Sequence, residues 1–359
     1  MVTDDLFLEL HTLIERFDRE QIYILTDSNA ATHCVPVLME ELGDLGAPFI
    51  QKLRDHTFIL PAGEEHKTLD SVCRIWDFLI SQHATRQALL LNLGGGMITD
   101  IGGFAASCYQ RGIPFVNIPT TLLAIVDASE GAKTGFDYHG LKNQIGLFRE
   151  ALETIVYPPF LKTLPREQFL SGFAEMLKHA LIASPLEWDR ILALDIDRLY
   201  RHPDERLKEE FSAILTRSLD IKRYFYEIDP EEKDMRKTLN FGHTIGHAIE
   251  SRLIERGEPQ PHGYCVLWGM IAELYISHAQ LGFPSQHLAQ LVQIAKEYYD
   301  GILFSCKDYD RLIALMRHDK KNNGGQINFT LLRNIGNPFI NRTADDELIR
   351  EALDYLFSI

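Results

Sequence analysis

Histidine and carboxylate side chains occur in the second half of the sequence at spacings that suit metal chemistry. His243 and His247 lie four residues apart, so on a helix they share one face. His262 directly precedes another helical stretch, and Glu175 lies in an earlier one. Two histidines and one carboxylate that leave a position open are a typical catalytic zinc set, and a further histidine can carry protons or bind anions. The residues alone do not show that these side chains meet, and capped or core histidines are the alternative.

A glycine cluster in the first half has the composition of a phosphate-binding turn. Gly94, Gly95 and Gly96 follow an apolar run and open a predicted helix. Glycine lets the backbone approach a ligand closely, and the N–H groups of a helix N-terminus bind phosphate. Asp27 and Asn29, after the first apolar run, have side chains suited to ribose hydroxyls and to turns. Because the GxGxxG pattern is missing, nucleotide binding and an ordinary tight turn both remain open.

Residues 127–146 hold cationic and amide side chains in a glycine-rich setting. Lys133, Lys142 and Asn143 lie there, with few strong helix or strand signals around them. Loops that carry lysines and amides suit a doubly anionic substrate. The segment is predicted to be a loop, and a solvated surface loop without a ligand is the alternative.

Two further cations precede the histidine pair. Arg236 is predicted on the same helix as His243, about two turns earlier, and Lys222 on the helix before it. Each alone is typical of a solvated surface. Their closeness in sequence to the metal candidates favours a role in binding an anionic substrate.

The elements that would position the first-half residues alternate between strands and helices. Each predicted strand is a short apolar run that ends at turn residues, at 22–25, 57–60, 88–93 and 115–118. Helical spacing lies between them, as at 69–79. Continuous apolar strands separated by helices indicate a parallel sheet covered on both faces, and such sheets bind ligands beyond the carboxyl ends of their strands.

The second half is predicted to be mostly helical, and we place the domain boundary between residues 157 and 158. The expected helices are long segments at 166–183, 205–226, 234–256 and 262–281. Alternating apolar residues at 327, 329 and 331 predict one short strand near the C-terminus. The fold class is therefore α/β followed by all-α, with domains 1–157 and 158–359.

Composition limits the class of partner. The chain has 359 residues, and 36 Lys+Arg minus 51 Asp+Glu leaves a net charge of −15. This excludes a broad nucleic-acid-binding surface and leaves room for a small basic pocket. No apolar run approaches the roughly 20 residues that cross a bilayer, and the N-terminus lacks a signal-peptide pattern. Five cysteines without CxxC spacing indicate a reducing compartment, and we expect a cytoplasmic protein without a membrane partner.

Taken together, these motifs resemble the 3-dehydroquinate synthases, within the wider group of sugar phosphate cyclases. The resemblance runs from about residue 23 to residue 336. Its motifs, in chain order, are Gly63-Glu64 with Lys67, GGG with Asp100, Arg111-Gly112, Ile118 to Leu123, Asp127 with Lys133-Thr134-Gly135, Lys142-Asn143, Phe160 with Thr163-Leu164-Pro165, Ala174-Glu175 with Lys178, Arg236 to His243, His262-Gly263 and Asp319-Lys320-Lys321.

The resemblance implies an N-terminal Rossmann-like NAD domain, a C-terminal helical domain and a homodimer. It implies a divalent metal, Zn²⁺ before Co²⁺, held by Glu175, His243 and His262. The implied NAD contacts are Asp27, Asn29, Glu64, Lys67, Gly95, Gly96, Asp100, Thr120, Thr121, Asp127, Lys133, Lys142, Phe160 and Thr163. The implied catalytic and substrate-binding residues are Lys133, Asn143, Lys178, Lys222, Arg236, Asn240, His247 and one of Lys320 or Lys321, with Arg111 reaching the neighbouring subunit's site.

The implied reaction is a lyase step of the shikimate route to chorismate and the aromatic amino acids. It converts a sugar acid phosphate, 3-deoxy-D-arabino-heptulosonate 7-phosphate, to 3-dehydroquinate and phosphate. Transient oxidation by NAD is followed by phosphate elimination, re-reduction and intramolecular aldol closure, so that NAD is not consumed.

The chain departs from the family pattern at a few positions. Glu130 stands where a small or apolar residue is usual, Ala132 where glycine is usual, and Tyr264-Cys265 where an acidic residue often follows the histidine. The alternatives are a cyclase for another sugar phosphate, such as a valiolone or inosose synthase, and a metal-dependent polyol or alcohol dehydrogenase. A binding protein that kept the scaffold fits least, since metal, cofactor and anion residues are all present.

Overall fold

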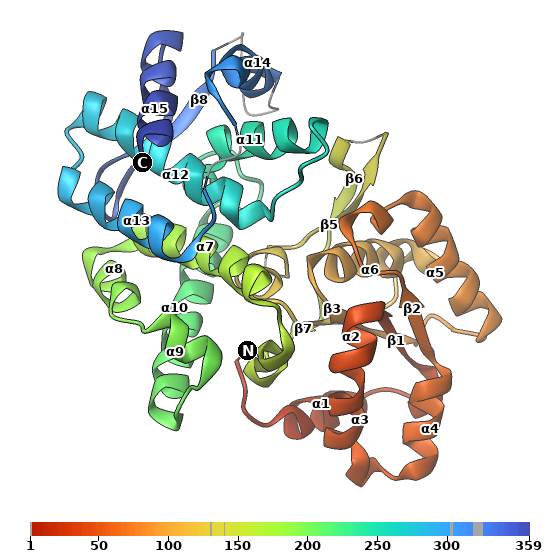
Figure 1. Ribbon diagram of the computed structural model, residues 1–359. Helices are drawn as coiled ribbons and strands as arrows, with labels where there is room; N and C mark the ends of the chain where they lie inside the picture. The colour runs from red at the N-terminus through yellow and green to blue at the C-terminus, as the bar shows by residue number, and fades with distance from the viewer. Residues whose placement is uncertain (1, 130, 140, 302–303, 319–325) are drawn as a thin grey trace. The chain divides into compact units, whose positions relative to one another are not determined.

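The computed structural model describes residues 2–129, 131–139, 141–301, 304–318 and 326–359. The chain forms two compact units, Met1–Pro165 and Arg166–Ile359, drawn from red to yellow-green and from green to blue in Figure 1. In the described part of the chain, no helix combines the length and the apolarity needed to cross a bilayer.

The first unit is built on a parallel sheet, as the apolar runs predicted. Its sheet strands are β1 (Ile22–Asp27), β2 (Thr57–Leu60), β3 (Leu89–Gly94), β4 (Phe115–Pro119) and β7 (Glu153–Thr154). All neighbours are parallel, in the order β2-β1-β3-β4-β7. The chain moves from β1 to β2 on one side and then to β3 on the other, so the strand order switches direction at the β1–β3 pair, where doubly wound folds bind ligands.

Helices cover both faces of this sheet (Figure 1). The helical segments of the unit are α1 (Leu6–Ile14), η1 (Arg19–Gln21), α2 (Ser28–His33), α3 (Val35–Glu41), η2 (Gly43–Leu45), α4 (Ala47–Asp55), η3 (Glu64–His66), α5 (Leu69–Ser81), α6 (Gly96–Cys108), η4 (Tyr109–Arg111), η5 (Ala124–Ala128) and η6 (Pro158–Thr163). Side chains alternate along each strand. Ile24 therefore packs with residues of α1, α3 and α4, whereas Leu25 packs with α5 and α6.

The segment predicted to be a loop at 127–146 is instead largely a β-hairpin, so that prediction was wrong. β5 (Lys133–Tyr138) and β6 (Leu141–Phe148) pair antiparallel, and Gly135 lies opposite Gly146. Thr134 and Phe136 are buried, and β5 packs against α6. The glycines that resembled a loop signal are accommodated by close strand pairing, and tertiary contact with α6 outweighs weak local propensity.

The second unit is mostly helical, as predicted. Its segments are α7 (Arg166–Ala183), α8 (Pro185–Leu192), α9 (Ile196–Arg201), α10 (Glu205–Ile228), η7 (Met235–Asn240), α11 (His243–Glu255), α12 (His262–Leu281), α13 (Ser285–Tyr298), η8 (Cys306–Asp308), α14 (Tyr309–His318), β8 (Asn328–Asn334), β9 (Asn337–Thr343) and α15 (Asp346–Ser358). α12 is buried on nearly all sides and packs against α7, α11, α13, α15 and β8. It is the central helix of this unit.

The helix predicted over residues 234–256 is interrupted, which corrects a second prediction. Arg236 lies in the 3₁₀ helix η7, and His243 begins the separate helix α11. Gly242 between them has φ 79°, in the left-handed region that an α-helix cannot contain. Arg236 therefore does not share a continuous helix with the histidine pair.

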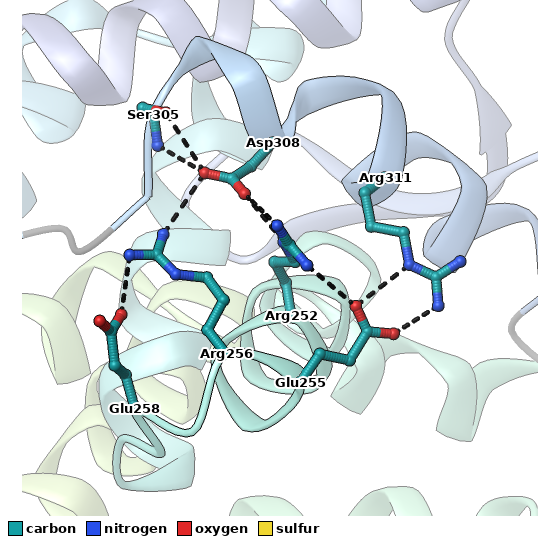
Figure 2. A network of polar contacts seen from close by, with 7 residues as sticks. All are labelled: Arg252, Glu255, Arg256, Glu258, Ser305, Asp308 and Arg311. Atoms are coloured by element: carbon teal, nitrogen blue, oxygen red, sulfur yellow. Dashed lines mark hydrogen bonds and ion pairs between the residues drawn. The ribbon is translucent and has the colours of Figure 1, made fainter.

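A network of matched charges holds the second half of α11 against η8 and α14 (Figure 2). Asp308 Oδ1 lies 2.8 Å from Arg252 Nη2, and its Oδ2 lies 3.4 Å from Arg256 Nη1. Asp308 also accepts a hydrogen bond from the Ser305 backbone N–H at 2.9 Å. Glu255 pairs with both Arg252 and Arg311. The carboxylate charges drawn in Figure 2 therefore face arginines.

Candidate functional site

Three helices of the second unit bring together the residues expected to bind metal. Glu175 comes from the middle of α7, and His243 and His262 are the first residues of α11 and α12. Glu175 Oε1 lies 3.5 Å from His243 Nε2 and 3.7 Å from His262 Nε2. Glu175 is fully buried and His243 is 8% exposed. The three side chains face one small volume, in which Glu175 and His243 are shielded from solvent and His262 is partly exposed.

Gly263 allows α12 to approach α7 at this point. A Cβ on Gly263 would lie 1.9 Å from the backbone oxygen of Ser171, one turn before Glu175. The Gly263 N–H also donates to Ser171 Oγ at 3.0 Å. The residue after His262 therefore has to be glycine if the histidine is to reach the carboxylate.

Hydrogen bonds set the tautomers of both histidines. His243 Nδ1 is 3.0 Å from the carbonyl oxygen of Phe241, which can only accept, so this nitrogen carries the proton. His262 Nδ1 is 3.1 Å from Glu250 Oε2 and donates to that carboxylate in the same way. In neutral rings each Nε2 then presents a lone pair toward Glu175, as in histidines that bind metal.

The donors fit a divalent metal. Oε1 of Glu175 accepts no hydrogen bond from the described residues, whereas Oε2 pairs with Lys178 Nζ. Two imidazole lone pairs and a buried carboxylate oxygen within 4 Å repel one another unless a cation lies among them. Two nitrogens and one carboxylate oxygen are the donor set of catalytic zinc sites that keep an open position.

His247 adds a third imidazole at the edge of this cluster. It lies one turn after His243 on α11, and their ring centroids are 5.2 Å apart. Ring nitrogens of His243, His247 and His262 all lie within 4.8 Å of one another, so these three could also hold a metal. The set with Glu175 differs in having a carboxylate, which would offset the charge of an ion.

Cationic residues of the same unit are unusually buried. Lys178 on α7, Lys222 on α10 and Arg236 on η7 are 1%, 5% and 3% exposed. Arg236 Nη1 donates to the Pro230 carbonyl at 2.7 Å, and Asn240 Nδ2 donates to Glu232 at 2.8 Å. η7 packs against both α7 and α10. Lys178 pairs with Glu175, and an anionic substrate would add a further counter-charge to this group of cations.

Sequence reasoning missed three buried polar residues in this unit. His179, one turn after Glu175, lies 2.8 Å through Nδ1 from Ser218 Oγ on α10, one turn before Lys222. Glu250 and Glu273 contact α12 and α11, respectively. Their signal in the sequence was weak: Glu273 is the one acidic residue of the apolar helix α12, whereas His179 and Glu250 each share a helix face with a metal candidate.

In the first unit, the residues expected to bind the cofactor follow the carboxyl ends of four parallel strands. Asp27 ends β1, Glu64 follows β2, Gly95 follows β3 and Thr120 follows β4. Asp27 Oδ1 accepts from the N–H groups of Asn29 and Ala30, at 2.8 and 3.1 Å, and caps α2. Asn29 itself is exposed.

The glycine turn lies against β4 at this edge. Thr120 N donates to the Gly94 oxygen at 2.9 Å, and a Cβ on Gly95 would lie 3.2 Å from the Thr121 side chain. α6 begins at Gly96, as predicted, so its first N–H groups are available to an anion at the carboxyl end of the sheet.

Lys67 contacts residues both at the carboxyl edge of the sheet and on the β5–β6 hairpin. It is 3% exposed, and its Nζ lies 2.6 Å from Asp100 Oδ2, 2.7 Å from Asn143 Oδ1 and 3.5 Å from Glu64 Oε1. Burial alone would lower the pKa of Lys67, but the carboxylates of Asp100 and Glu64 raise it. One charged lysine, itself an expected cofactor residue, thus contacts two others and one expected substrate residue.

Other predicted residues are spread over the first unit. Lys133 and Lys142 are exposed on the hairpin, where Asn143 has φ 51°. Arg111 is exposed with φ 70°, and Asp127 lies in η5. The Phe160 ring is buried against Tyr157, and Thr163 ends η6 in an exposed position.

Lys320 and Lys321, with Asp319, lie outside the described residues, as does Glu130. Ala132 is described and has φ 63°, a conformation that favours glycine.

Comparison with known proteins covers nearly the whole chain. The family model for 3-dehydroquinate synthase, N-terminal, matches residues 57–171, and the model for 3-dehydroquinate synthase, C-terminal, matches residues 172–322. The 3-dehydroquinate synthase of Parabacteroides distasonis is 43% identical over 356 residues, 99% of this chain and 96% of that protein. The 3-dehydroquinate synthase of Thermosynechococcus vestitus is 40% identical over 83% of this chain and 80% of its own length.

Solved structures share the fold at lower identity. A 2-epi-5-epi-valiolone synthase from Streptomyces hygroscopicus, with NAD⁺ and Zn²⁺ bound, has a TM-score of 0.84 at 24% identity and covers 100% of this chain and 96% of its own. A 2-deoxy-scyllo-inosose synthase with carbaglucose-6-phosphate, NAD⁺ and Co²⁺ has a TM-score of 0.78 at 22% identity, covering 99% and 95%. These likenesses show the fold, while the family models and the curated relatives show that this chain belongs to the 3-dehydroquinate synthase family.

Proposed function

We propose that this chain converts 3-deoxy-D-arabino-heptulosonate 7-phosphate to 3-dehydroquinate and phosphate, in the shikimate route to chorismate. The observation that carries the proposal is the cluster of Glu175, His243 and His262, in which two imidazole lone pairs face a buried carboxylate. Relatives named 3-dehydroquinate synthase at 43% identity over nearly the full chain support the same reaction.

Each unit has a residue set for one cofactor. Glu175, His243 and His262 would hold a divalent metal, which we propose to be Zn²⁺, and the residues at the carboxyl ends of β1 to β4 would hold NAD⁺. When bound, NAD⁺ supplies a reversible hydride acceptor and the metal supplies a Lewis acid for the hydroxyl that is oxidised.

The chain's own residues orient an anionic substrate and stabilise the phosphate that leaves. Lys178 is buried beside Glu175, so its ammonium group lies next to the metal ligands. We assign Lys178, Lys222 and Arg236 to the substrate's carboxylate and phosphate, because guanidinium and ammonium groups bind both well. Holding both anionic ends keeps the open-chain intermediate in position for ring closure.

We assign proton handling to His247. It is half-buried at the edge of the histidine cluster and outside the proposed ligand set. A ring nitrogen of His247 can accept a proton and pass it to a phosphate oxygen, because imidazole titrates near neutral pH.

The decisive experiment is phosphate release from the heptulosonate phosphate in the presence of NAD⁺ and Zn²⁺. We expect phosphate and 3-dehydroquinate in equal amounts, no net NADH, and loss of turnover with a chelator. Absence of phosphate release would overturn the proposal. Release only from another sugar phosphate would indicate a different cyclase, and accumulation of NADH would indicate a dehydrogenase.

We further propose that the chain is a homodimer in which Arg111 reaches the neighbouring site. Arg111 is exposed on η4 and has a strained φ, and both features support a contact with a neighbouring subunit. Co-expressed Arg111→Ala and His243→Ala chains should restore about a quarter of the active sites by random pairing. No restoration, or a monomeric mass in solution, would contradict the assignment.

We also propose a cytoplasmic location. The support is that all five cysteines are free thiols, of which Cys34 and Cys265 are buried, as expected in a reducing compartment. Fractionation of cells that express the chain with immunodetection tests this, and recovery outside the cytoplasmic fraction would contradict it.

A further inference from the structure

α11 and α12 each carry a buried carboxylate that contacts the start of the other helix. Glu250 on α11 is 7% exposed, and its Oε2 lies 3.1 Å from Nδ1 of His262, the first residue of α12. Glu250 lies seven residues after His243 and three after His247, so all three share one face of α11.

Glu273 makes the reverse contact. It is fully buried on α12, and its carboxylate accepts hydrogen bonds from three backbone N–H groups at the start of α11, those of Gly242, Thr244 and Ile245, at 2.7, 3.1 and 3.2 Å. The first N–H groups of a helix have no partner within it, and negative charge there is favourable.

This contact replaces an ordinary helix cap. The N-cap position of α11 is Gly242, which has no side chain to accept those N–H groups. The start of α11, with His243 inside it, is therefore positioned by a residue of α12. Because burying a carboxylate is costly, Glu273 is stable there only while the two helices keep this relation.

We propose that Glu250 and Glu273 are positioning residues that raise the affinity of the metal cluster. Glu250 fixes the ring of His262 and makes its Nε2 more basic, and Glu273 fixes the helix start that holds His243. The inference rests on the proposed function only in taking Glu175, His243 and His262 as the metal ligands. It assigns residues that contact neither metal nor substrate.

The test measures Zn²⁺ affinity of the full chain by competition with a chromophoric chelator. Glu250→Ala should weaken binding by about 10- to 100-fold, the usual effect of losing a carboxylate that orients a ligand histidine. Glu250→Gln keeps an acceptor oxygen for His262 and should recover part of this loss. Glu273→Gln leaves one oxygen for three N–H donors and should weaken Zn²⁺ binding and lower the Tm.

The matched control is Asp308→Asn, which alters a buried carboxylate that pairs with Arg252 and Arg256 on the same helix. It should lower the Tm and leave Zn²⁺ affinity unchanged. In the Co²⁺-substituted protein, the visible spectrum should change in Glu250→Ala and stay unchanged in Asp308→Asn. These readouts separate positioning from general stability.

The inference is overturned if Glu250→Ala binds Zn²⁺ like the wild type with an unchanged Co²⁺ spectrum. It is also overturned if Asp308→Asn weakens Zn²⁺ binding as much as Glu250→Ala. If Glu273→Gln does not fold, the two Glu250 variants decide. A wild-type chain that binds no Zn²⁺ would overturn the metal assignment itself, whereas normal metal binding without phosphate release would overturn only the proposed reaction.

Discussion

The two ends of α11 carry polar clusters of different composition. At its second half, Arg252, Glu255 and Arg256 meet Asp308 and Arg311 in the alternating network of Figure 2. At its start, His243 presents a lone pair to Oε1 of the buried Glu175, an oxygen that accepts no hydrogen bond from the described residues, while Oε2 pairs with Lys178. Internally matched charges stabilise the fold, whereas a buried cluster of acceptors indicates a cation supplied from outside.

The largest expected effect comes from removing a proposed metal ligand at the start of α11. His243→Ala should abolish stoichiometric Zn²⁺ binding and lower turnover by about three orders of magnitude, because a Lewis acid contributes several kcal/mol to such a step. Bound metal is measured by mass spectrometry and turnover by phosphate release. Retained stoichiometric Zn²⁺ would show that the ligand set is wrong.

A second variant disturbs the same proposed metal cluster by changing how two helices pack. Gly263→Ala places a methyl group 1.9 Å from the Ser171 oxygen, so α12 has to move away from α7. We expect a loss of about 1–3 kcal/mol in the free energy of unfolding together with weaker Zn²⁺ binding. Urea denaturation and chelator competition measure the two. Normal Zn²⁺ affinity in a destabilised variant would mean that His262 tolerates the shift.

A substitution in the charge network at the second half of α11 should change the stability of the protein and leave its activity unchanged. Asp308→Asn removes charge-assisted hydrogen bonds and should cost about 1–3 kcal/mol, measured by urea denaturation, with turnover unchanged. Loss of turnover in folded Asp308→Asn protein would contradict the separation of the two ends.

The same pair of proteins gives a pH test. Burial raises the pKa of Asp308, but hydrogen bonds from the Ser305 backbone and Arg252 lower it more, so the net pKa lies below its usual value. A carboxyl group whose pKa is lower in the folded state than in the unfolded state stabilises the fold at pH values above its unfolded pKa of about 4. This stabilisation is lost as the pH falls through the pKa of the folded state. The difference in urea midpoint between wild type and Asp308→Asn should therefore be constant above about pH 5 and shrink below about pH 4. A difference that grows on acidification would contradict this sign.

The smallest effect is expected at the exposed rim of the matched network. Arg311 is 48% exposed and pairs with Glu255. Exposed ion pairs contribute little, so Arg311→Gln should change the Tm by less than about 2 °C. Calorimetry measures it, and a larger shift would mean that the network acts as one cooperative unit.

Local patterns predicted much of the fold. The apolar runs located β1 to β4, and the 3.6-residue period located α7 and α12 with their observed bounds. The predictions failed where a distant contact decides the local structure. The 127–146 segment forms a hairpin because β5 packs on α6. The predicted helix over 234–256 breaks at Gly242, which has a left-handed backbone conformation, and apolar periodicity does not reveal such a break.

For the site, the sequence by itself determined which side chains have the right chemistry and that His243 and His247 share a helix face, because that relation depends only on four residues of helical rise. Only the tertiary structure decided that Glu175 and His262 join them, since their helices meet through packing at Gly263 and not through sequence distance. The same holds for Glu250 and Glu273, each of which acts on a partner from another helix. A carboxylate on an apolar helix acquires its role from the donor that packing places beside it.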